Sequence, residues 1–313
     1  METQTERPSV GGTEQLKDIK GKIIEYCFHM KKKGYADATI RLHRVALKTL
    51  AERGADLLSP ETVKEVIAKQ KWSENRKYNV ISAYDKFLRF IGLTWDKPLC
   101  KARTQKIPFI PIEAELDALI CGTGKKLSTF LQLLKETAMR CGEAKRLKWI
   151  DIDFEKGIVK LNDPEKGSNP RMWKVSQKLI AMLNALPRES QRVFGDGPIN
   201  SLKTTFLKAR KRLAAKLQNP RLLSISFHTF RHWKATMLYH QTKDPYYVKQ
   251  FLGHKELRNT EIYINIERTM FEPGSDEFTV KIAEKPEEVK ALLEVGFEYV
   301  CQKEGLIFLR KRK

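Results

Sequence analysis

The side chains best suited to chemistry lie between positions 227 and 263. This stretch contains Phe227-His228-Thr229-Phe230-Arg231-His232, then Leu252-Gly253-His254, and then Thr260-Glu261-Ile262-Tyr263. Imidazole titrates near neutral pH, a guanidinium group holds oxyanions through paired hydrogen bonds, and a phenol can act as a nucleophile that forms a covalent intermediate. Taken singly, each group is more often structural, since most buried tyrosines belong to a core. The information therefore lies in their combination and order.

Together these segments resemble the signature of the tyrosine recombinases, in which His-x-x-Arg and Leu-Gly-His precede a tyrosine nine residues beyond that last histidine. Here nine residues separate His254 from Tyr263. Upstream, residues 137–143 (Thr-Ala-Met-Arg-Cys-Gly-Glu) resemble the first arginine motif of the family, and Lys166-Gly167 lies where the family carries its lysine. The resemblance covers residues 112–271 and implies an enzyme that cleaves and rejoins DNA strands.

The resemblance also implies which residues act on the phosphate. Tyr263 would be the nucleophile, and the resulting 3′-phosphotyrosine intermediate would keep the bond energy for rejoining. Arg140 and Arg231 would hold the non-bridging oxygens of the pentacoordinate phosphorus. We expect both arginines at helix starts, where backbone dipoles favour an anion. Ala138 and Met139 depart from the family, which often has Gly-Leu at these positions.

Other candidates would move protons or support the site, again by resemblance. Lys166, on a hairpin loop, would give a proton to the departing 5′ oxygen, and Lys160 is the second candidate for that role. His228 would accept or orient the tyrosine proton, and His254 would hydrogen-bond the phosphate. Glu143 would brace the site.

Two further tyrosines, Tyr246 and Tyr247, are rival nucleophiles that follow the helix-start signal Asp244-Pro245. We interpret both as packing residues, because they precede the Gly253-His254 turn whereas the family's tyrosine follows it.

Charge indicates the partner. The 313 residues include 59 Lys and Arg against 38 Asp and Glu, a formal charge of +21, which favours a polyanion such as double-stranded DNA. An anionic membrane is the alternative, but no apolar run is long enough to span a bilayer. The first residues also lack the charged start and apolar core of a secretory signal. We therefore expect a cytoplasmic, nucleoid-associated protein without membrane association.

No cofactor is expected. The five cysteines are scattered without metal-ligand spacing, so we interpret them as apolar core residues in a reducing compartment and predict neither zinc nor disulfides. Walker A and dinucleotide-binding glycine patterns are absent. By resemblance, the arginines and the lysine supply the charge stabilisation that metal ions give to other nucleases.

Apolar periodicity predicts a mainly α fold with a small β-sheet. We expect a disordered leader (1–13), a helical core-binding domain that binds DNA (14–98), a basic linker (99–111), a catalytic tyrosine recombinase domain of mixed α+β structure (112–274) and a small α/β appendage (275–313). The appendage is not part of the common family pattern.

Two basic helices are expected to grip DNA. The stretch 203–216 contains six cations and no acid, and a weaker version lies in the first domain. The candidate phosphate contacts are Lys203, Lys208, Arg210, Lys211, Arg212, Lys216, Arg41, Arg44 and Lys48.

The resemblance implies a site-specific recombinase or integrase that works as a homotetramer on paired DNA sites. Integration or excision of a mobile element and resolution of chromosome dimers remain open, as does the target sequence. The alternatives are a topoisomerase of type IB and a DNA-binding regulator that has lost cleavage.

Overall fold

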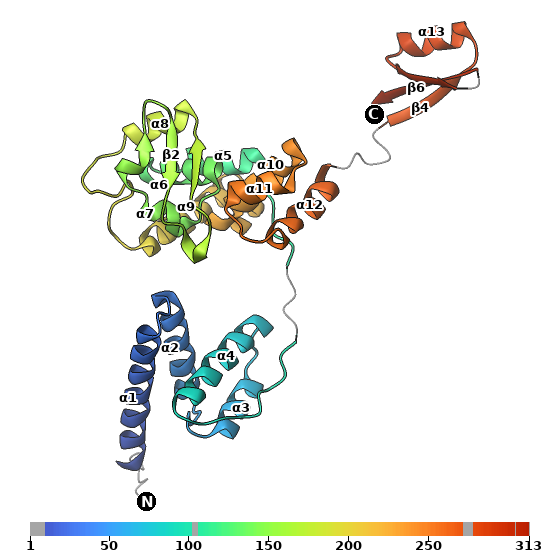
Figure 1. Ribbon diagram of the computed structural model, residues 1–313. Coiled ribbons are helices and arrows are strands. Elements are labelled where there is room, and N and C mark those ends of the chain that lie inside the picture. The colour runs from blue at the N-terminus through green and yellow to red at the C-terminus, as the bar shows by residue number, and fades with distance from the viewer. Residues whose placement is uncertain (1–9, 102–105, 272–277, 304, 313) are drawn as a thin grey trace, which may run out of the picture. The chain divides into compact units, whose positions relative to one another are not determined.

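The computed structural model describes residues 10–101, 106–271, 278–303 and 305–312, and it divides into two compact units, residues 1–106 and 107–313. Each unit has its own hydrophobic core. Helices dominate, and the strands form two small sheets (Figure 1), which confirms the expected fold class. In the part of the chain so described, no helix has the length and apolar character needed to cross a membrane.

The first unit is a bundle of four helices. They are α1 (Val10–Lys32), α2 (Asp37–Glu52), α3 (Pro60–Lys69) and α4 (Glu74–Phe90). Ser73 begins α4 by accepting a hydrogen bond from the backbone N–H of Arg76 (3.4 Å). The core is built around fully buried Leu50, Tyr84 and Phe87.

Two boundaries differ from those expected. Helix α1 begins at Val10, so residues 10–13 of the expected leader are helical, while residues 1–9 lie outside the described structure. At the other boundary, Phe109 and Ile110 pack against the core of the second unit, although they belong to the expected linker 99–111. The guanidinium of Arg221 lies 4.9 Å from the centre of the Phe109 ring and adds a cation–π contact.

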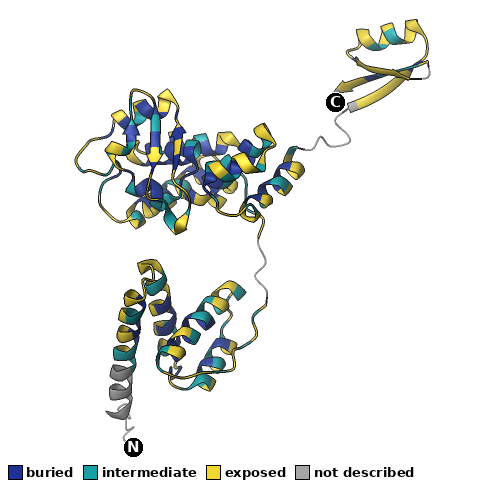
Figure 2. Cartoon of the chain, viewed as in Figure 1, coloured by how far each residue is buried: buried dark blue, intermediate teal, exposed yellow. Residues whose placement is uncertain are grey.

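The second unit is organised around α6, four of whose side chains, Phe130, Leu131, Leu133 and Leu134, are fully buried. This helix contacts α5, α7, α8, α9 and α10. The helices are α5 (Glu113–Cys121), α6 (Lys125–Thr137), α7 (Cys141–Arg146), α8 (Gln177–Asn184), α9 (Ile199–Lys216), α10 (Phe227–Thr242), α11 (Pro245–Leu252) and α12 (Arg258–Phe271). Figure 2 shows the buried residues concentrated inside this body, and Figure 1 shows α10, α11 and α12 packed together.

A three-stranded antiparallel sheet accompanies these helices. Its order is β1 (Ile152–Asp153), β2 (Ile158–Leu161) and β3 (Arg171–Lys174). Val159 pairs with Trp173, and both are buried, so one face of the β2–β3 hairpin packs on the core. The loop between these strands contains the 3₁₀ turn η2 (Glu165–Gly167), which carries Lys166.

The last segment forms a second antiparallel sheet with one helix. Its elements are β4 (Phe278–Ala283), α13 (Pro286–Glu294), β5 (Glu298–Lys303) and β6 (Leu306–Arg312), and β6 is the central strand. A small core around Ala283, Phe297 and Leu309 joins helix and sheet. All of β5 is exposed (Figure 2).

Candidate active site

The first arginine, Arg140, precedes the first residue of α7, at a helix start as expected. Helix α6 ends at Thr137, and Ala138 follows in the left-handed conformation with φ 53°. This conformation costs residues other than glycine about 1–2 kcal/mol, which is a physical reason for the glycine that the family often has at this position. The backbone carbonyl of Ala138 accepts a hydrogen bond from Arg231 Nη1 (2.7 Å), so the strained turn lies within the site.

Glu143 is a fully buried carboxylate that orients Arg140. It accepts hydrogen bonds from the Arg140 backbone amide (2.8 Å), the Arg140 guanidinium (2.9 Å), Arg171 Nη2 (3.0 Å) and the Glu165 amide (3.1 Å). Burial opposes ionisation, but the hydrogen bonds and the charge of Arg171 outweigh it and lower the pKa of Glu143. These contacts are the ones that a brace for Arg140 would make.

Replacing Glu143 by Gln is expected to destabilise the protein by about 3–5 kcal/mol near neutral pH, because it leaves the buried guanidinium of Arg171 without a counter-charge. The folded-state pKa of Glu143 is lowered, so its carboxylate stabilises the fold above the ordinary carboxyl pKa, and this stabilisation is lost as the pH falls through the lowered value. Urea unfolding at several pH values should therefore show the largest difference between wild type and Glu143→Gln near neutrality.

The exposed residue Glu256 supplies the control, since Glu256→Gln should change stability little at any pH. Equal stabilities of wild type and Glu143→Gln at neutral pH would contradict the bracing contact.

Arg171 was missed by sequence reasoning, although it lies at the centre of the site. It is buried on β3, donates to Glu143 and to the Leu252 carbonyl, and its Nε has no partner among the described residues. Burial lowers the pKa of Arg171, while Glu143 raises it. The available signal was the two-residue spacing of Arg171 and Trp173, because residues two apart in a strand share a face, and Trp173 is buried on β3.

Arg231 lies in the second turn of α10, so the expectation that it begins a helix was wrong. The helix begins at Phe227, because the Ser226 hydroxyl accepts from the Thr229 amide (3.3 Å) and the Thr229 hydroxyl accepts from the Ser226 amide (2.9 Å). The reciprocal Ser-x-x-Thr pair was the overlooked signal.

The guanidinium of Arg231 is held rigidly inside the second unit. The residue is 2% exposed, and Nη1 and Nη2 donate to the carbonyls of Ala138 and Leu252, each at 2.7 Å. Burial, with the charges of Arg140 and Arg171, lowers the pKa of Arg231 to about 9, which leaves it charged at neutral pH. Arg140 and Arg171 bond to the buried carboxylate of Glu143, and Arg231 interacts with it electrostatically. Three guanidinium groups thus share one carboxylate, so this part of the site carries excess positive charge that an oxyanion would offset.

The Gly253-His254 turn meets these arginines. Gly253 ends α11 with φ 70°, and a Cβ placed there would lie 2.7 Å from Arg171 Nε, so both the backbone conformation and the close approach require glycine. His254 Nδ1 lies 3.0 Å from the Thr260 hydroxyl. Burial, followed by the charges of Arg231 and the other arginines, lowers the pKa of His254 to about 3, so its imidazole is neutral at physiological pH.

Lys166 is exposed on the β2–β3 loop, in a left-handed backbone conformation with φ 56°. The loop reaches the site through Ser168, whose hydroxyl lies 2.7 Å from Arg140 Nη1, and through the Asn169 amide, 3.4 Å from the Gly253 carbonyl. Lys160, the second candidate for proton donation, lies on an exposed position of β2 opposite Met172.

Tyr263 lies on α12 with 3% of its surface exposed, packed in a small core with residues of α10 and α11. Burial raises the pKa of its phenol, and the charge of Arg231 opposes that rise. His232 Nδ1, rather than the expected His228, lies 3.0 Å from the phenolic oxygen.

His228 is exposed on the first turn of α10, with its ring perpendicular to that of His232 at 4.6 Å between centroids. The covered part of the ring lowers the pKa of His228, and the charges of Arg231, Arg140 and Lys166 lower it further. Because His228 interacts electrostatically with the two arginines and the loop lysine, it belongs to the same site.

Two interpretations are corrected by the structure. Tyr246 and Tyr247 are 62% and 46% exposed on the first turn of α11, so they are not packing residues. Asp244 caps that turn by accepting hydrogen bonds from their backbone amides. The cysteines are free thiols, but none is a core residue, since three are half-buried at core edges and two are exposed. The half-buried cysteines are Cys27, Cys100 and Cys141, and the exposed ones are Cys121 and Cys301.

Over the described ranges, no cluster of three or more His, Cys, Asp or Glu side chains could hold a metal ion.

The candidate DNA contacts of α9 are mostly exposed. Lys203, Lys208, Lys211 and Lys216 lie at the surface, while Arg212 donates to the Gly122 carbonyl (2.8 Å). Arg210 differs, because it is half-buried and donates to the Ile225 carbonyl.

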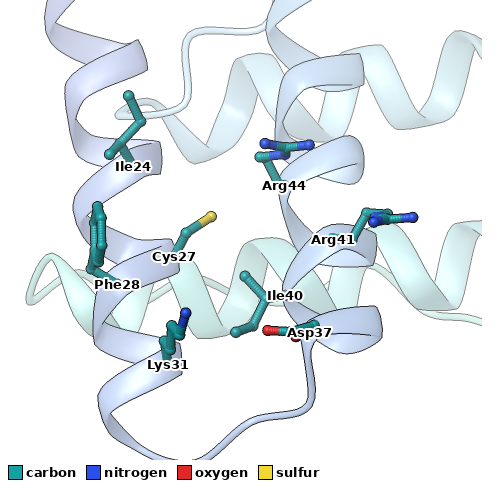
Figure 3. Close-up of a pocket in the computed structure, with 8 residues that line it drawn as sticks. All are labelled: Ile24, Cys27, Phe28, Lys31, Asp37, Ile40, Arg41 and Arg44. Carbon is teal, nitrogen blue, oxygen red and sulfur yellow. The ribbon is translucent and has the colours of Figure 1, made fainter. Parts of the chain in front are cut away.

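The first unit contributes Arg41 and Arg44, which line a groove between α1 and α2 beside Ile24 and Phe28 (Figure 3). Lys48, the third candidate on α2, pairs with Glu52 at 3.4 Å.

The chain is similar in sequence to known proteins. Residues 115–270 match the model of the phage integrase family. Tyrosine recombinase XerA of Pyrococcus furiosus is 25% identical over 264 residues, which are 80% of this chain and 91% of that protein. Tyrosine recombinase XerD of Pseudomonas aeruginosa is 29% identical over 176 residues, covering 50% of this chain and 57% of XerD.

Solved structures share the fold at low sequence identity. A lambda integrase tetramer bound to a Holliday junction superposes with a TM-score of 0.59 at 14% identity, covering 78% of this chain and 76% of that one. The XerH recombinase bound to its difH substrate gives 0.52 at 18% identity, covering 74% and 79%. The family match, the relatives and the arrangement of arginines, histidines and tyrosine identify this chain as a tyrosine recombinase of the phage integrase family.

Proposed function

We propose that this protein is a site-specific DNA recombinase that cleaves and rejoins strands through a 3′-phosphotyrosine intermediate on Tyr263. The observation that carries the proposal is the convergence of Arg140, Arg231, His254 and Tyr263 at one positively charged site in the second unit. The named relatives are recombinases, which supports recombination over the topoisomerase and regulator alternatives.

Charge stabilisation by the arginines is the main proposed contribution to the rate. As Tyr263 attacks, negative charge grows on the non-bridging oxygens, and Arg140 and Arg231 would bind them with N–H groups that are already oriented. His254, neutral in the free protein, would add a hydrogen bond. Lys166 would protonate the departing 5′ oxygen from its exposed loop, which can approach the DNA from outside the arginine cluster.

The basic face of α9 is proposed to hold the DNA backbone. The logarithm of the DNA-binding constant falls linearly with the logarithm of the salt concentration, and each phosphate contact contributes about 0.9 to this slope. Replacing both Lys208 and Lys211 by alanine should therefore make the slope shallower by about 1.8. Fluorescence anisotropy with a labelled duplex over a salt series would measure this slope. Lys69, paired with Glu65 on α3, is the control, and an unchanged slope in the double variant would remove α9 from the DNA interface.

We further propose that protomers assemble as a tetramer on paired DNA sites, and that they act with the nucleoid in the cytoplasm. The solved lambda integrase complexes include a dimer on a core site and a tetramer on a Holliday junction, which supports the expectation of assembly on DNA.

The test of the proposed function does not need the target sequence in advance. A pool of duplexes with randomised sequence, each nicked so that cleavage releases a short fragment and traps the intermediate, is incubated with the protein. DNA that stays with the protein under denaturing conditions is then sequenced. We expect a defined site to emerge, and two such sites to yield recombinant products. Trapping without sequence preference and without recombinants would favour the topoisomerase alternative, and no trapped DNA would favour the regulator.

A further inference from the structure

The proposed cleavage requires that the phenol of Tyr263 lose its proton as it attacks phosphorus, and the geometry points to His232 as the acceptor. We propose that His232 is a catalytic residue that orients the Tyr263 hydroxyl and takes up its proton. This inference rests on the proposed function and assigns to His232 the role that the family resemblance gives to His228.

The distance between the two side chains favours His232 as the acceptor. Helices α10 and α12 pack against each other, and His232 Nδ1 lies 3.0 Å from the Tyr263 oxygen, within the range for direct proton transfer. Tyr263 is 3% exposed, so bulk water has little access to compete for its proton. His228, by contrast, is exposed and makes its ring contact with His232, and among the described residues no hydrogen bond joins it to Tyr263.

The protonation state of His232 also suits a proton acceptor. Burial lowers its pKa to about 4, with smaller contributions from the charges of His228 and Arg231. The ring is therefore neutral at pH 7. In the tautomer that carries its proton on Nε2, Nδ1 is free to accept the phenolic hydrogen.

The same charges couple proton transfer to DNA binding. In the free protein the phenol holds its proton, because its own pKa is raised while that of His232 is lowered. The groups that face His232 are His228 and Arg231 on its own helix and Tyr263 on α12. A DNA phosphate bound at Arg231 would offset part of that positive charge and make His232 a stronger base when the nucleophile is needed.

The step balances. The proton leaves Tyr263 for His232 Nδ1 while the Tyr263 oxygen bonds to phosphorus, and the bond from phosphorus to the 5′ oxygen breaks as that oxygen takes a proton from Lys166. Rejoining reverses each transfer, and His232 returns its proton to the phenol.

The test measures the single-turnover rate of covalent adduct formation on the trapping duplex with the full chain. We expect His232→Gln, which keeps a hydrogen-bonding amide but cannot take up a proton, to slow the reaction by about 10²–10⁴-fold. His240→Gln is the matched control. His240 also lies on α10, and its Nδ1 lies 2.7 Å from Oε1 of Glu267 on α12, but this pair is outside the site. It should react at the wild-type rate.

A second measurement separates proton acceptance from a structural role. A fluorinated tyrosine at position 263, whose phenol is more acidic, should restore at least about tenfold of the rate lost in His232→Gln, since the acceptor is then less needed. The same rescue is not expected in His228→Gln. His232→Asn, checked like His232→Gln by thermal melting and DNA binding, repeats the test.

Three results would overturn the inference: wild-type cleavage by folded His232→Gln, no rescue by the fluorinated tyrosine, or rescue in His228→Gln instead. Adduct formation by the wild-type protein on the same duplex shows that such a failure does not come from the proposed function itself.

Discussion

Replacing Arg231 by lysine is expected to slow strand cleavage by at least about 10²–10³-fold, the loss that follows removal of one oriented donor from a transition-state anion. The guanidinium of Arg231 uses two nitrogens to bind the carbonyls of Ala138 and Leu252. These two bonds fix the plane of the guanidinium group, and its remaining N–H groups would bind the phosphate. A lysine has one amine, which cannot hold both carbonyls and also present a second donor to the oxygens.

The control for this prediction is Arg171→Lys. Arg171 is also buried and also donates to the Leu252 carbonyl, but its other partner is Glu143 rather than the expected position of the phosphate. We expect Arg171→Lys to lower stability and to slow cleavage much less than Arg231→Lys does, because Arg171 supports Glu143 and does not itself hold the phosphate. Single-turnover adduct formation and urea unfolding measure the two effects. A folded Arg231→Lys protein that cleaves within a few-fold of the wild-type rate would contradict the proposed clamp.

Tyr263→Phe is expected to abolish covalent adduct formation while DNA binding remains. Phenylalanine keeps the ring that packs between α10, α11 and α12, so the fold should persist. The lost hydrogen bond to His232 should cost about 1–3 kcal/mol of stability, since it leaves a partly buried imidazole nitrogen unpaired. Gel-shift binding and denaturing gels on the trapping duplex measure the two properties.

Tyr246→Phe combined with Tyr247→Phe is the matched control. Both tyrosines are exposed on α11, and their loss should leave adduct formation intact. If the double variant loses adduct formation and Tyr263→Phe retains it, the nucleophile lies on α11.

Much of the site could be predicted from sequence because its residues fall in short segments with a fixed local geometry. Arg140 was expected at a helix start and is found there, and the turn at Gly253 follows from a left-handed helix end that only glycine adopts freely. Lys166 was likewise expected on a hairpin loop, and it lies on the loop between β2 and β3.

What sequence reasoning missed depends on how the segments pack in three dimensions. His228 and His232 lie one turn apart on the same face of α10, and only the packing of α12 decides which of them meets Tyr263. Arg171 was missed because its importance comes from Glu143 and Leu252, 28 and 81 residues away along the chain.

The most direct test of the proposed chemistry is to identify the residue and the DNA end that become joined. Wild-type protein trapped on its duplex is digested with protease and nuclease, and the linked peptide is sequenced by mass spectrometry. We predict a peptide with Tyr263 attached to a 3′ phosphate, and a free 5′ hydroxyl on the other side of the break. A phosphate linked to any other residue, or a tyrosine joined to a 5′ phosphate, would contradict it.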